Sequence, residues 1–477
     1  MEGTPATLHR IRYARRGALQ TVFALGALIL AGCQPLQTMP ALQDPTPTQW
    51  RNASQTKDDR NAAPAPDLDG WWHAFGDAQL DALVTQALAD NLNIAQAQQR
   101  LIAARALAAA SRGDFRPILH TGTFAAPSPD ATTSYFQADV DATWELGLFG
   151  RGQSTRWVVQ AGLDGAAEDL QSARVTLVAE VVRDYLALRG AQQQVALSEQ
   201  ILEAQRARRA LTQRRLQLGL AADADIASTD ADVAQAEAAL AEPRTSASVS
   251  AQQLALLCGR SEPQPELLSV ATSPRLAADV PTTVPADLLR TRPDIRHAES
   301  AVLAAAGELG IAKADLYPRL SLAGAITYAI STSNGEFGLG HAAISFGPAI
   351  DMPLFDWGAR RARVAAKDAE LSATVDGYHE TVLEAVAETE IALATWHEQR
   401  LRVVSLRTAV AARERDARGA AHGRQLGLTD GVDQAAATIA LTQSRLELLD
   451  AEQAQSLAYV AMYKALGGAP PTADALR

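Results

Sequence analysis

Residues 136–148 read Phe-Gln-Ala-Asp-Val-Asp-Ala-Thr-Trp-Glu-Leu-Gly-Leu. Apolar and polar side chains alternate along this segment. The apolar set is Phe136, Ala138, Val140, Ala142, Trp144, Leu146 and Leu148, and the other set is Gln137, Asp139, Asp141, Thr143, Glu145 and Gly147. An apolar face opposite an acidic one is typical of a membrane β-barrel strand, with lipid on one side and water on the other. The segment exceeds the roughly 9–11 residues with which a tilted strand crosses a bilayer.

Three further segments show the same alternation, so the sequence predicts four strands. They are 118–126, where the pattern is weak, 320–330 and 344–354, and the last adds Asp351 to the acidic residues. Four strands cannot close a barrel, and open sheet edges in lipid leave backbone groups unsatisfied. Two copies would give eight strands around a filled interior, whereas three give twelve strands around a water-filled passage. The alternative is a soluble sandwich packed against helices.

Long helices dominate the rest of the chain. Proline is absent from 131–242 and from 354–469, and residues that favour helices fill both stretches. The predicted helices at about 153–218 and 359–426 would each be about 100 Å long at ~1.5 Å per residue. A helix is also expected from 78 to about 112. Pro243 lies inside a predicted return helix, from about 225 to 257, and should kink or break it.

The chain contains two copies of one pattern. Gln217-Leu218-Gly219-Leu220 and Asp225 match Gln425-Leu426-Gly427-Leu428 and Asp433, 208 residues further on. Residues 114–119 likewise parallel 315–320, and 148–149 parallel 354–355. We therefore predict a first repeat at 71–260 (strands about 117–149, long helices about 152–258) and a second at 286–468 (strands about 318–354, long helices about 359–466). Residues 261–285 connect them, and 469–477 form a C-terminal tail.

The N-terminus reads as a secretory signal. Four arginines precede an apolar run from Gly17 to Leu30, which ends in Leu30-Ala31-Gly32-Cys33. This pattern predicts a lipoprotein signal peptide at 1–32, a lipidated Cys33 and an extended tether over 33–70. An unmodified cysteine beside an ordinary cleavage site is the alternative. Gln34, instead of the aspartate that retains lipoproteins at the inner membrane, favours the outer membrane.

Charge and motif content argue against several functions. Removal of 1–32, with four arginines and one glutamate, lowers the net charge from −11 to −14, so nucleic-acid binding is not expected. The histidines lack metal-ligand spacing, and no phosphate loop or nucleophile elbow is present. Cys258 lies in an apolar run and reads as a small core residue. We therefore predict no catalytic residues, no metal and no cofactor other than the lipid on Cys33.

Six motifs, weak singly, are specific in their order along the chain. They are Trp71-Trp72 with Phe75-Gly76-Asp77 and Leu80; Trp144-Glu145-Leu146 with Leu148-Phe149-Gly150-Arg151; Leu288-Leu289-Arg290 with Arg292-Pro293-Asp294-Ile295 and Glu299; Ile311-Ala312-Lys313-Ala314 with Tyr317-Pro318; Pro353-Leu354-Phe355-Asp356 with Gly358; and Tyr463-Lys464-Ala465-Leu466-Gly467-Gly468. Through them the mature chain resembles the outer-membrane efflux protein family, the TolC-like trimeric channels. The resemblance is to the lipoprotein branch that works with resistance-nodulation-division pumps.

The resemblance implies a mainly α-helical homotrimer with a membrane β part. A twelve-stranded barrel in the outer membrane would continue into a periplasmic α-helical barrel, and the partners would be a periplasmic adaptor and an inner-membrane pump. A ring of Asp433 side chains would close the periplasmic end, although the family's second acidic position is Ala436 here. Mutual repulsion would make that closure depend on cations or pH. Asp433 also suits an ordinary helix start.

The two Leu-Gly-Leu turns are the expected adaptor contacts. Their residues are Leu218, Gly219, Leu220, Leu426, Gly427 and Leu428. A helix C-cap explains each glycine, but it explains the flanking leucines less readily. Asp139, Asp141, Glu145 and Asp351 would line the lumen and favour cations.

The expected function is passive export of small molecules, drugs or other toxic compounds. A type I protein secretion conduit and a stalk without a passage are the alternatives. Metal export is a narrower variant, and four methionines are too few for a ladder of soft-cation ligands.

Overall fold

The computed structural model describes residues 37–42, 50–52, 68–126, 134–276, 286–331 and 340–469. The predicted signal peptide 1–32, Cys33, most of the tether, residues 277–285 and residues 470–477 lie outside this described part. The chain divides into two compact units. We call residues 1–44, 100–167 and 297–380 the sheet unit, and residues 45–99, 168–296 and 381–477 the helical unit.

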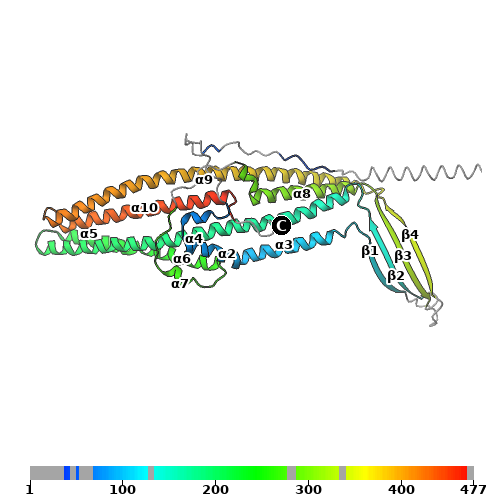
Figure 1. Ribbon diagram of the computed structural model, residues 1–477, viewed down its shortest axis with the longest axis horizontal. Helices are drawn as coiled ribbons and strands as arrows, with labels where there is room; N and C mark the ends of the chain where they lie inside the picture. The colour runs from blue at the N-terminus through cyan, green and yellow to red at the C-terminus, as the bar shows by residue number, and fades with distance from the viewer. Residues whose placement is uncertain are drawn as a thin grey trace, which may run out of the picture. The chain divides into compact units, whose positions relative to one another are not determined.

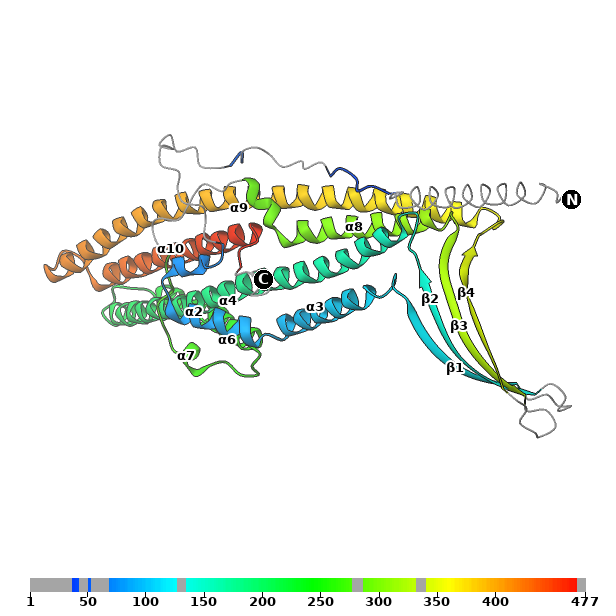
Figure 2. The same ribbon diagram turned by 45° about the vertical axis from the view of Figure 1, so that its right-hand side comes forward.

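The sheet unit contains one antiparallel sheet (Figures 1 and 2). Its strands are β1 (Ile118–Ala126), β2 (Tyr135–Glu145), β3 (Arg319–Ser331) and β4 (His341–Asp351), paired in the order β1-β2-β3-β4. Each half of the chain supplies a hairpin, and β2 pairs with β3 across the two halves, with Glu145 opposite Ser321. Strands β1 and β4 therefore form the two edges of the sheet.

Two strands end earlier than the sequence predicted. Leu146 to Leu148 follow the alternation, yet β2 ends at Glu145. Gly147 has φ of 57°, and a Cβ there would lie 2.6 Å from the ring of Phe115, so the chain turns where only glycine fits. Strand β4 ends at Asp351 instead of 354, just before Pro353, which has no N–H to continue a ladder.

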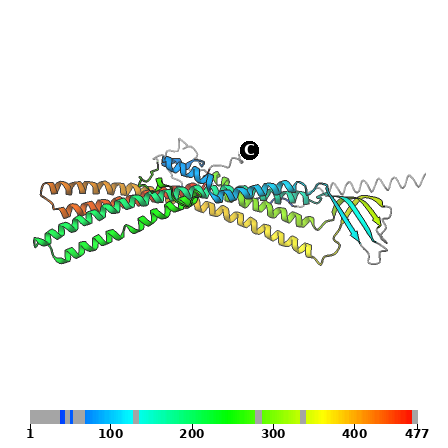
Figure 3. The same ribbon diagram turned by 90° about the horizontal axis from the view of Figure 1, so that it is seen from below.

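Two continuous helices of 67 residues each dominate the chain, α4 (Arg151–Gln217) and α9 (Ala359–Gln425). In the helical unit each turns back on itself. The first hairpin returns through α5 (Asp223–Ala238) and α6 (Ala241–Leu257), and the second through α10 (Gly431–Ala465). Figure 3 shows the first hairpin in green and the second in orange and red.

The expected break near Pro243 lies at Ala239 and Leu240, three to four residues before the proline. Helix α5 ends at Ala238, and α6 begins at Ala241, so Pro243 is the third residue of the new helix. A proline in a first turn removes no hydrogen bond that the helix needs. The return helix of the second repeat, α10, has no such break.

The prediction of one helix from 78 to 112 is wrong. The segment forms α2 (Ala78–Asp90) and α3 (Leu92–Ser111), separated at Asn91. The extended backbone of Asn91 ends α2, and its side-chain oxygen accepts hydrogen bonds from the N–H groups of Asn93 and Ile94, at 2.9 and 3.2 Å. Asparagine is a strong N-cap, so a new helix starts there.

An aromatic cluster in the helical unit connects the first helix of the described chain with the segment that follows α10. The short helix η1 (Trp71–Phe75) buries Trp71, whose ring stacks on Tyr463 at 5.4 Å and whose Nε1 donates to the carbonyl of Gly468. The hydroxyl of Tyr459 donates to the carbonyl of Trp71. Three shorter elements complete the described chain: α7 (Pro265–Leu268), η2 (Ala286–Thr291) and α8 (Pro293–Ala314).

Candidate functional site

The sheet brings the four predicted lumen residues onto one face. Directly opposed residues of antiparallel strands point to the same side. Asp139 opposes Gly122 and Thr327, and Asp141 opposes His120 and Ala325. Asp351 opposes Arg319. The face they share also carries Gln137, Thr143, Glu145, Ser321, Ala323, Ser345 and Gly347, with Ile118, Phe124 and Tyr135 near the ends of β1 and β2. It is therefore a largely polar face with acidic residues along its length.

The opposite face of the same sheet is apolar and exposed. It carries Leu119, Phe136, Val140, Trp144, Leu322, Ile326, Tyr328, Ile330, Ile344, Phe346 and Ile350. Ile344 and Phe346 are each 79% exposed, which is far more than a soluble sheet leaves uncovered. An apolar environment would therefore stabilise this face.

An ion-pair cluster lies where the strands meet the helices of the sheet unit. Arg151, the first residue of α4, contacts Glu145 at 3.1 Å and Asp315 at 2.6 Å. Arg319 contacts Asp315 at 2.7 Å. Burial alone would raise the pKa of Asp315, but hydrogen bonds from Arg319 and Arg151 outweigh it and lower that pKa. Glu145 is thus paired with Arg151, whereas no ion pair is found for Asp139 or Asp141 among the described residues.

The two Leu-Gly-Leu turns form the tips of the helical hairpins. Leu218 and Leu220 are each 73% exposed, and Leu426 and Leu428 are 60% and 77% exposed. Gly219 and Gly427 have φ of 72° and 73°. The N–H of Leu220 donates to the carbonyl of Arg215 at 2.8 Å, and in the second turn the N–H of Leu428 donates to Gly423 at 2.8 Å. This pattern is a Schellman C-cap, which requires the glycine, while the leucines on either side of it remain largely exposed.

Asp433 lies in the first turn of α10 and takes part in a capping box. The side chain of Asp430 accepts hydrogen bonds from the N–H groups of Val432 and Asp433, at 2.8 and 3.0 Å, and the carboxylate of Asp433 accepts from the N–H of Asp430 at 3.4 Å. Asp225 makes the equivalent contact in the first repeat, with the N–H of Ala222 at 2.8 Å. The local contacts of Asp433 are therefore those of an ordinary helix start, which was the alternative to a role in closing the channel.

Asp430 is a tip residue that the sequence reasoning missed. Its carboxylate forms an ion pair with Arg215 at the end of α4 and so connects the two hairpins. Near this contact an open groove of about 350 Å³ lies between the hairpins, lined by residues that include Glu203, Leu211 and Arg424. The signal was present as two aspartates three residues apart after a turn, the spacing of a capping box.

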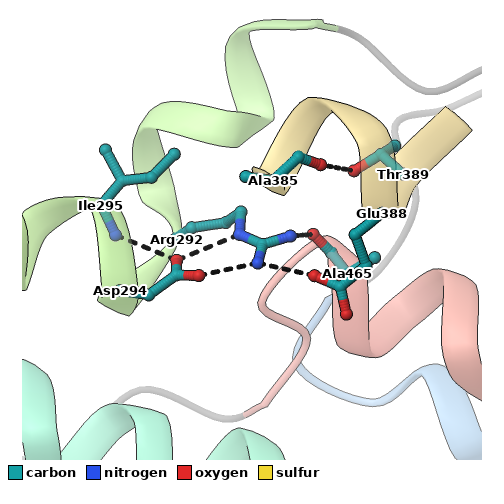
Figure 4. A network of polar contacts seen from close by, with 7 residues as sticks. All are labelled: Arg292, Asp294, Ile295, Ala385, Glu388, Thr389 and Ala465. Atoms are coloured by element: carbon teal, nitrogen blue, oxygen red, sulfur yellow. Dashed lines mark hydrogen bonds and ion pairs between the residues drawn. The ribbon is translucent and has the colours of Figure 1, made fainter. Parts of the chain in front are cut away.

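Arg292, from the motif Arg292-Pro293-Asp294, is the centre of a polar network in the helical unit (Figure 4). Its Nη1 donates to the carbonyl of Ala465, the last residue of α10, and its Nη2 donates to Asp294 at 2.7 Å and to Glu388 of α9 at 2.8 Å. Burial alone would raise the pKa of Asp294, but the hydrogen bonds from Arg292 lower it. One nearly buried guanidinium thus holds the ends of α8 and α10 against α9.

Two further findings apply to the described residues. No group of three or more histidine, cysteine, aspartate or glutamate side chains is placed to hold a metal ion. No described helix is both long enough and apolar enough to span a membrane.

Comparison with known proteins finds similar proteins that match most of the chain. The outer membrane efflux protein family matches residues 83–260 and 284–468. Nodulation protein T of Rhizobium leguminosarum bv. viciae is 30% identical over 68% of this chain and 69% of its own length. The antibiotic efflux pump outer membrane protein ArpC of Pseudomonas putida is 26% identical over 93% and 94%. The solved outer-membrane channel OprN is 30% identical, with a TM-score of 0.79 over 91% of this chain and 99% of its own.

Fold and sheet together define a channel-forming protein of the outer membrane. The chain belongs to the outer membrane efflux protein family, whose two matched segments cover most of its length. Members of this family form efflux channels and are not enzymes. The resemblance predicted from the six motifs is confirmed.

Proposed function

We propose that three copies of this chain form a channel that passively conducts small molecules across the outer membrane. The observation that supports this proposal most directly is the sheet. It has a polar acidic face, an exposed apolar face and two edge strands, β1 and β4. Three sheets supply twelve strands, enough to surround a water-filled lumen, whereas the eight strands of two copies would enclose mainly side chains. The apolar face would meet lipid and the acidic face would line the lumen.

The helical hairpins would form the periplasmic continuation of the channel. The exposed leucines of the two tips offer apolar surface to an adaptor protein, which in turn connects to an inner-membrane pump. A ring of three Asp433 carboxylates would oppose closure at high pH and favour it when protons or cations screen them. The Arg215–Asp430 ion pair would hold the two hairpins of each copy together near that ring.

The cargo would be drugs or other toxic small molecules. Support comes from the relative ArpC, which is named for antibiotic efflux, and from the motif Arg292-Pro293-Asp294, which resembles the drug-efflux branch. Both favour this function over a type I protein secretion conduit. A lipid on Cys33 would anchor the chain in the outer membrane, with 33–70 as the tether.

Conductance across a planar lipid bilayer tests the proposal. Purified wild-type oligomer should conduct more at high pH than at low pH or with added divalent cations, and Asp433→Ala should lose this dependence, because the mutual repulsion of the carboxylates and its screening are removed. In a KCl gradient the open channel should prefer K⁺, and the double variant Asp139→Asn and Asp141→Asn should lose much of that preference. Glu145→Gln is the matched control and should change selectivity less, because Glu145 already contacts the guanidinium of Arg151. A chain that never conducts, or a current carried mainly by chloride, would contradict the proposal.

A further inference from the structure

Parts of the predicted N-terminal tether lie against helices. The structure describes residues 37–42 and 50–52 of it, and we call these residues the strap. The first part belongs to the sheet unit, where it contacts α8, and the second belongs to the helical unit, where it contacts α9. Composition predicted only an extended tether, whereas these contacts connect it to the folded chain.

The second part of the strap binds one carboxylate on α9. The N–H of Arg51 donates to Oε1 of Glu390 at 2.6 Å, and the N–H of Asn52 donates to Oε2 at 3.0 Å. The side-chain Nδ2 of Asn52 also donates to the main-chain carbonyl of Glu390, at 3.3 Å. Both oxygens of the carboxylate are therefore used by successive main-chain N–H groups. Hydrogen bonds to an ionised acceptor are stronger than those between neutral groups.

A buried tryptophan directly precedes these hydrogen bonds. Trp50 is only 6% exposed, whereas Arg51 is exposed. A tryptophan ring removes about 150–250 Å² of surface from water when it is buried. One apolar anchor beside two N–H groups on a single carboxylate gives the contact both apolar burial and directed hydrogen bonds.

The first part of the strap is held near the end of α8. The Nζ of Lys313 donates to Oε1 of Gln37 at 2.7 Å. Gly310, one turn earlier on α8, has no side chain, and a Cβ there would lie 3.4 Å from the Cβ of Gln37. The glutamine can therefore lie close to the helix surface while an ammonium group binds its amide oxygen.

We propose that Lys313 and Glu390 form a receptor for the chain's own N-terminal segment and that this receptor holds the strap in place without help from the lipid. Glu390 binds main-chain N–H groups, so it is the residue on which docking of the second part depends. The inference goes beyond the proposed function, because it requires neither conduction nor a particular number of copies.

The receptor would restrict the position of the proposed lipid. Cys33 itself lies outside the described residues, and only four residues of chain lead from it to Gln37. At ~3.6 Å per residue the lipidated end can reach at most about 14 Å from that contact. The contact is on α8, which ends at Ala314, five residues before β3 begins at Arg319. The lipid would therefore be held close to the base of the sheet.

Limited digestion with trypsin tests the contact with Glu390, because trypsin cleaves after Arg51. Cleavage there and after Lys57 releases the peptide 52–57, which mass spectrometry detects. From the full-length chain in its membrane, this peptide should appear at least about tenfold faster in Glu390→Ala than in wild type, since two hydrogen bonds that close the site are lost. Glu384→Ala, an exposed glutamate on the same helix, is the matched control and should behave as wild type. Equal rates in Glu390→Ala and wild type would overturn the receptor.

Hydrogen exchange gives a second measurement, which does not depend on access by a protease. The amides of residues 51 and 52 should be protected in wild type and should lose this protection in Glu390→Ala. Unchanged exchange elsewhere in α9 would show that the helix of the variant is still folded. Lys313→Met should speed exchange in residues 37–42 and leave 51 and 52 protected.

The lipid is the other group that could keep the strap near the helices. Cys33→Ala should retain the wild-type protection of residues 51 and 52, because the receptor does not need the lipid. Loss of that protection in Cys33→Ala would assign the docking to the lipid and overturn the receptor.

Conductance separates this inference from the proposed function. Glu390→Ala should conduct as wild type, because the strap is not part of the proposed lumen. A chain that conducts but is cleaved after Arg51 equally fast with and without Glu390 overturns the receptor alone. A chain whose strap is protected by Glu390 but which never conducts overturns the channel proposal alone.

Discussion

At the scale of single residues, Arg292 shows how one side chain fixes several helices. Its guanidinium is nearly buried, and its hydrogen bonds reach the last carbonyl of α10, a carboxylate of α8 and a carboxylate of α9. A cation is well placed at the C-terminal end of a helix, where carbonyl groups lack partners. Lysine could not replace it, because only the guanidinium fork addresses three acceptors at once.

This network makes stability depend on pH. The pKa of Asp294 is lowered in the folded chain from the ordinary 3.8, so its contribution is present above the unfolded pKa and lost as pH falls through the folded one. Asp294→Asn should therefore cost about 1 kcal/mol at pH 7, since the carboxylate is partly exposed. Thermal melts from pH 7 to pH 3 should show a smaller acid destabilisation in the variant than in wild type. An equal loss in both would exclude this role for Asp294.

Sequence reasoning succeeds at single residues where the backbone demands one residue type. Gly219 and Gly427 were expected as C-caps, and both have the left-handed φ that this requires. It missed the Arg215–Asp430 ion pair, because partners 215 residues apart in a chain leave no local pattern. The roles of Asp433 and of the acidic strand residues stay predictions, although the sheet register does place those acids together.

At the scale of elements, substitutions at the helix tips should weaken adaptor binding without lowering the stability of the chain. Leu218→Ser with Leu220→Ser should leave the melting temperature nearly unchanged, since substitutions of exposed side chains usually stay within about 0.5 kcal/mol. The same variant should lose most of the efflux-dependent drug tolerance of cells, because the apolar surface for an adaptor is gone. Leu256→Ser on α6, with 69% of Leu256 exposed, is the matched control. Full tolerance in the tip variant would remove the tips from the adaptor interface.

Helices and strands were predictable where the sequence pattern that favours them continues without a break. Proline-free stretches predicted the two long helices within about two residues of their ends. The errors came at breaks set by one residue: Asn91 splits a helix whose apolar pattern continues across it, and Gly147 ends a strand whose alternation continues. Periodicity reports which face is apolar, but it does not report where a cap or a left-handed residue stops the element.

At the scale of the whole molecule, the proposed anchor has a direct test. Cells given labelled palmitate should incorporate it into wild type and into Cys258→Ala, but not into Cys33→Ala. Burial raises the pKa of the Cys258 thiol and keeps it unreactive, so it should not substitute as an acceptor. Label remaining on Cys33→Ala at wild-type level would refute lipidation of Cys33.

The sheet of one chain is enough to infer that several copies must assemble, but it is not enough to infer how many. Four strands with two edges demand partners in lipid, and this was already clear from the alternation of apolar and polar residues. The proposed number of three rests on the argument that eight strands would leave no water-filled passage and on the family resemblance, because no pattern within a chain encodes how many copies close a ring.

The matched lengths of the two hairpins restrict how this protein can evolve. Helices α4 and α9 have the same number of residues, and the tip glycines at 219 and 427 are 208 positions apart. An insertion of three or four residues in one helix alone would rotate its apolar stripe and shift one tip relative to the other. Natural length variants should therefore carry paired insertions or deletions, one in each half of the gene, and a change in only one half should be rare among functional relatives.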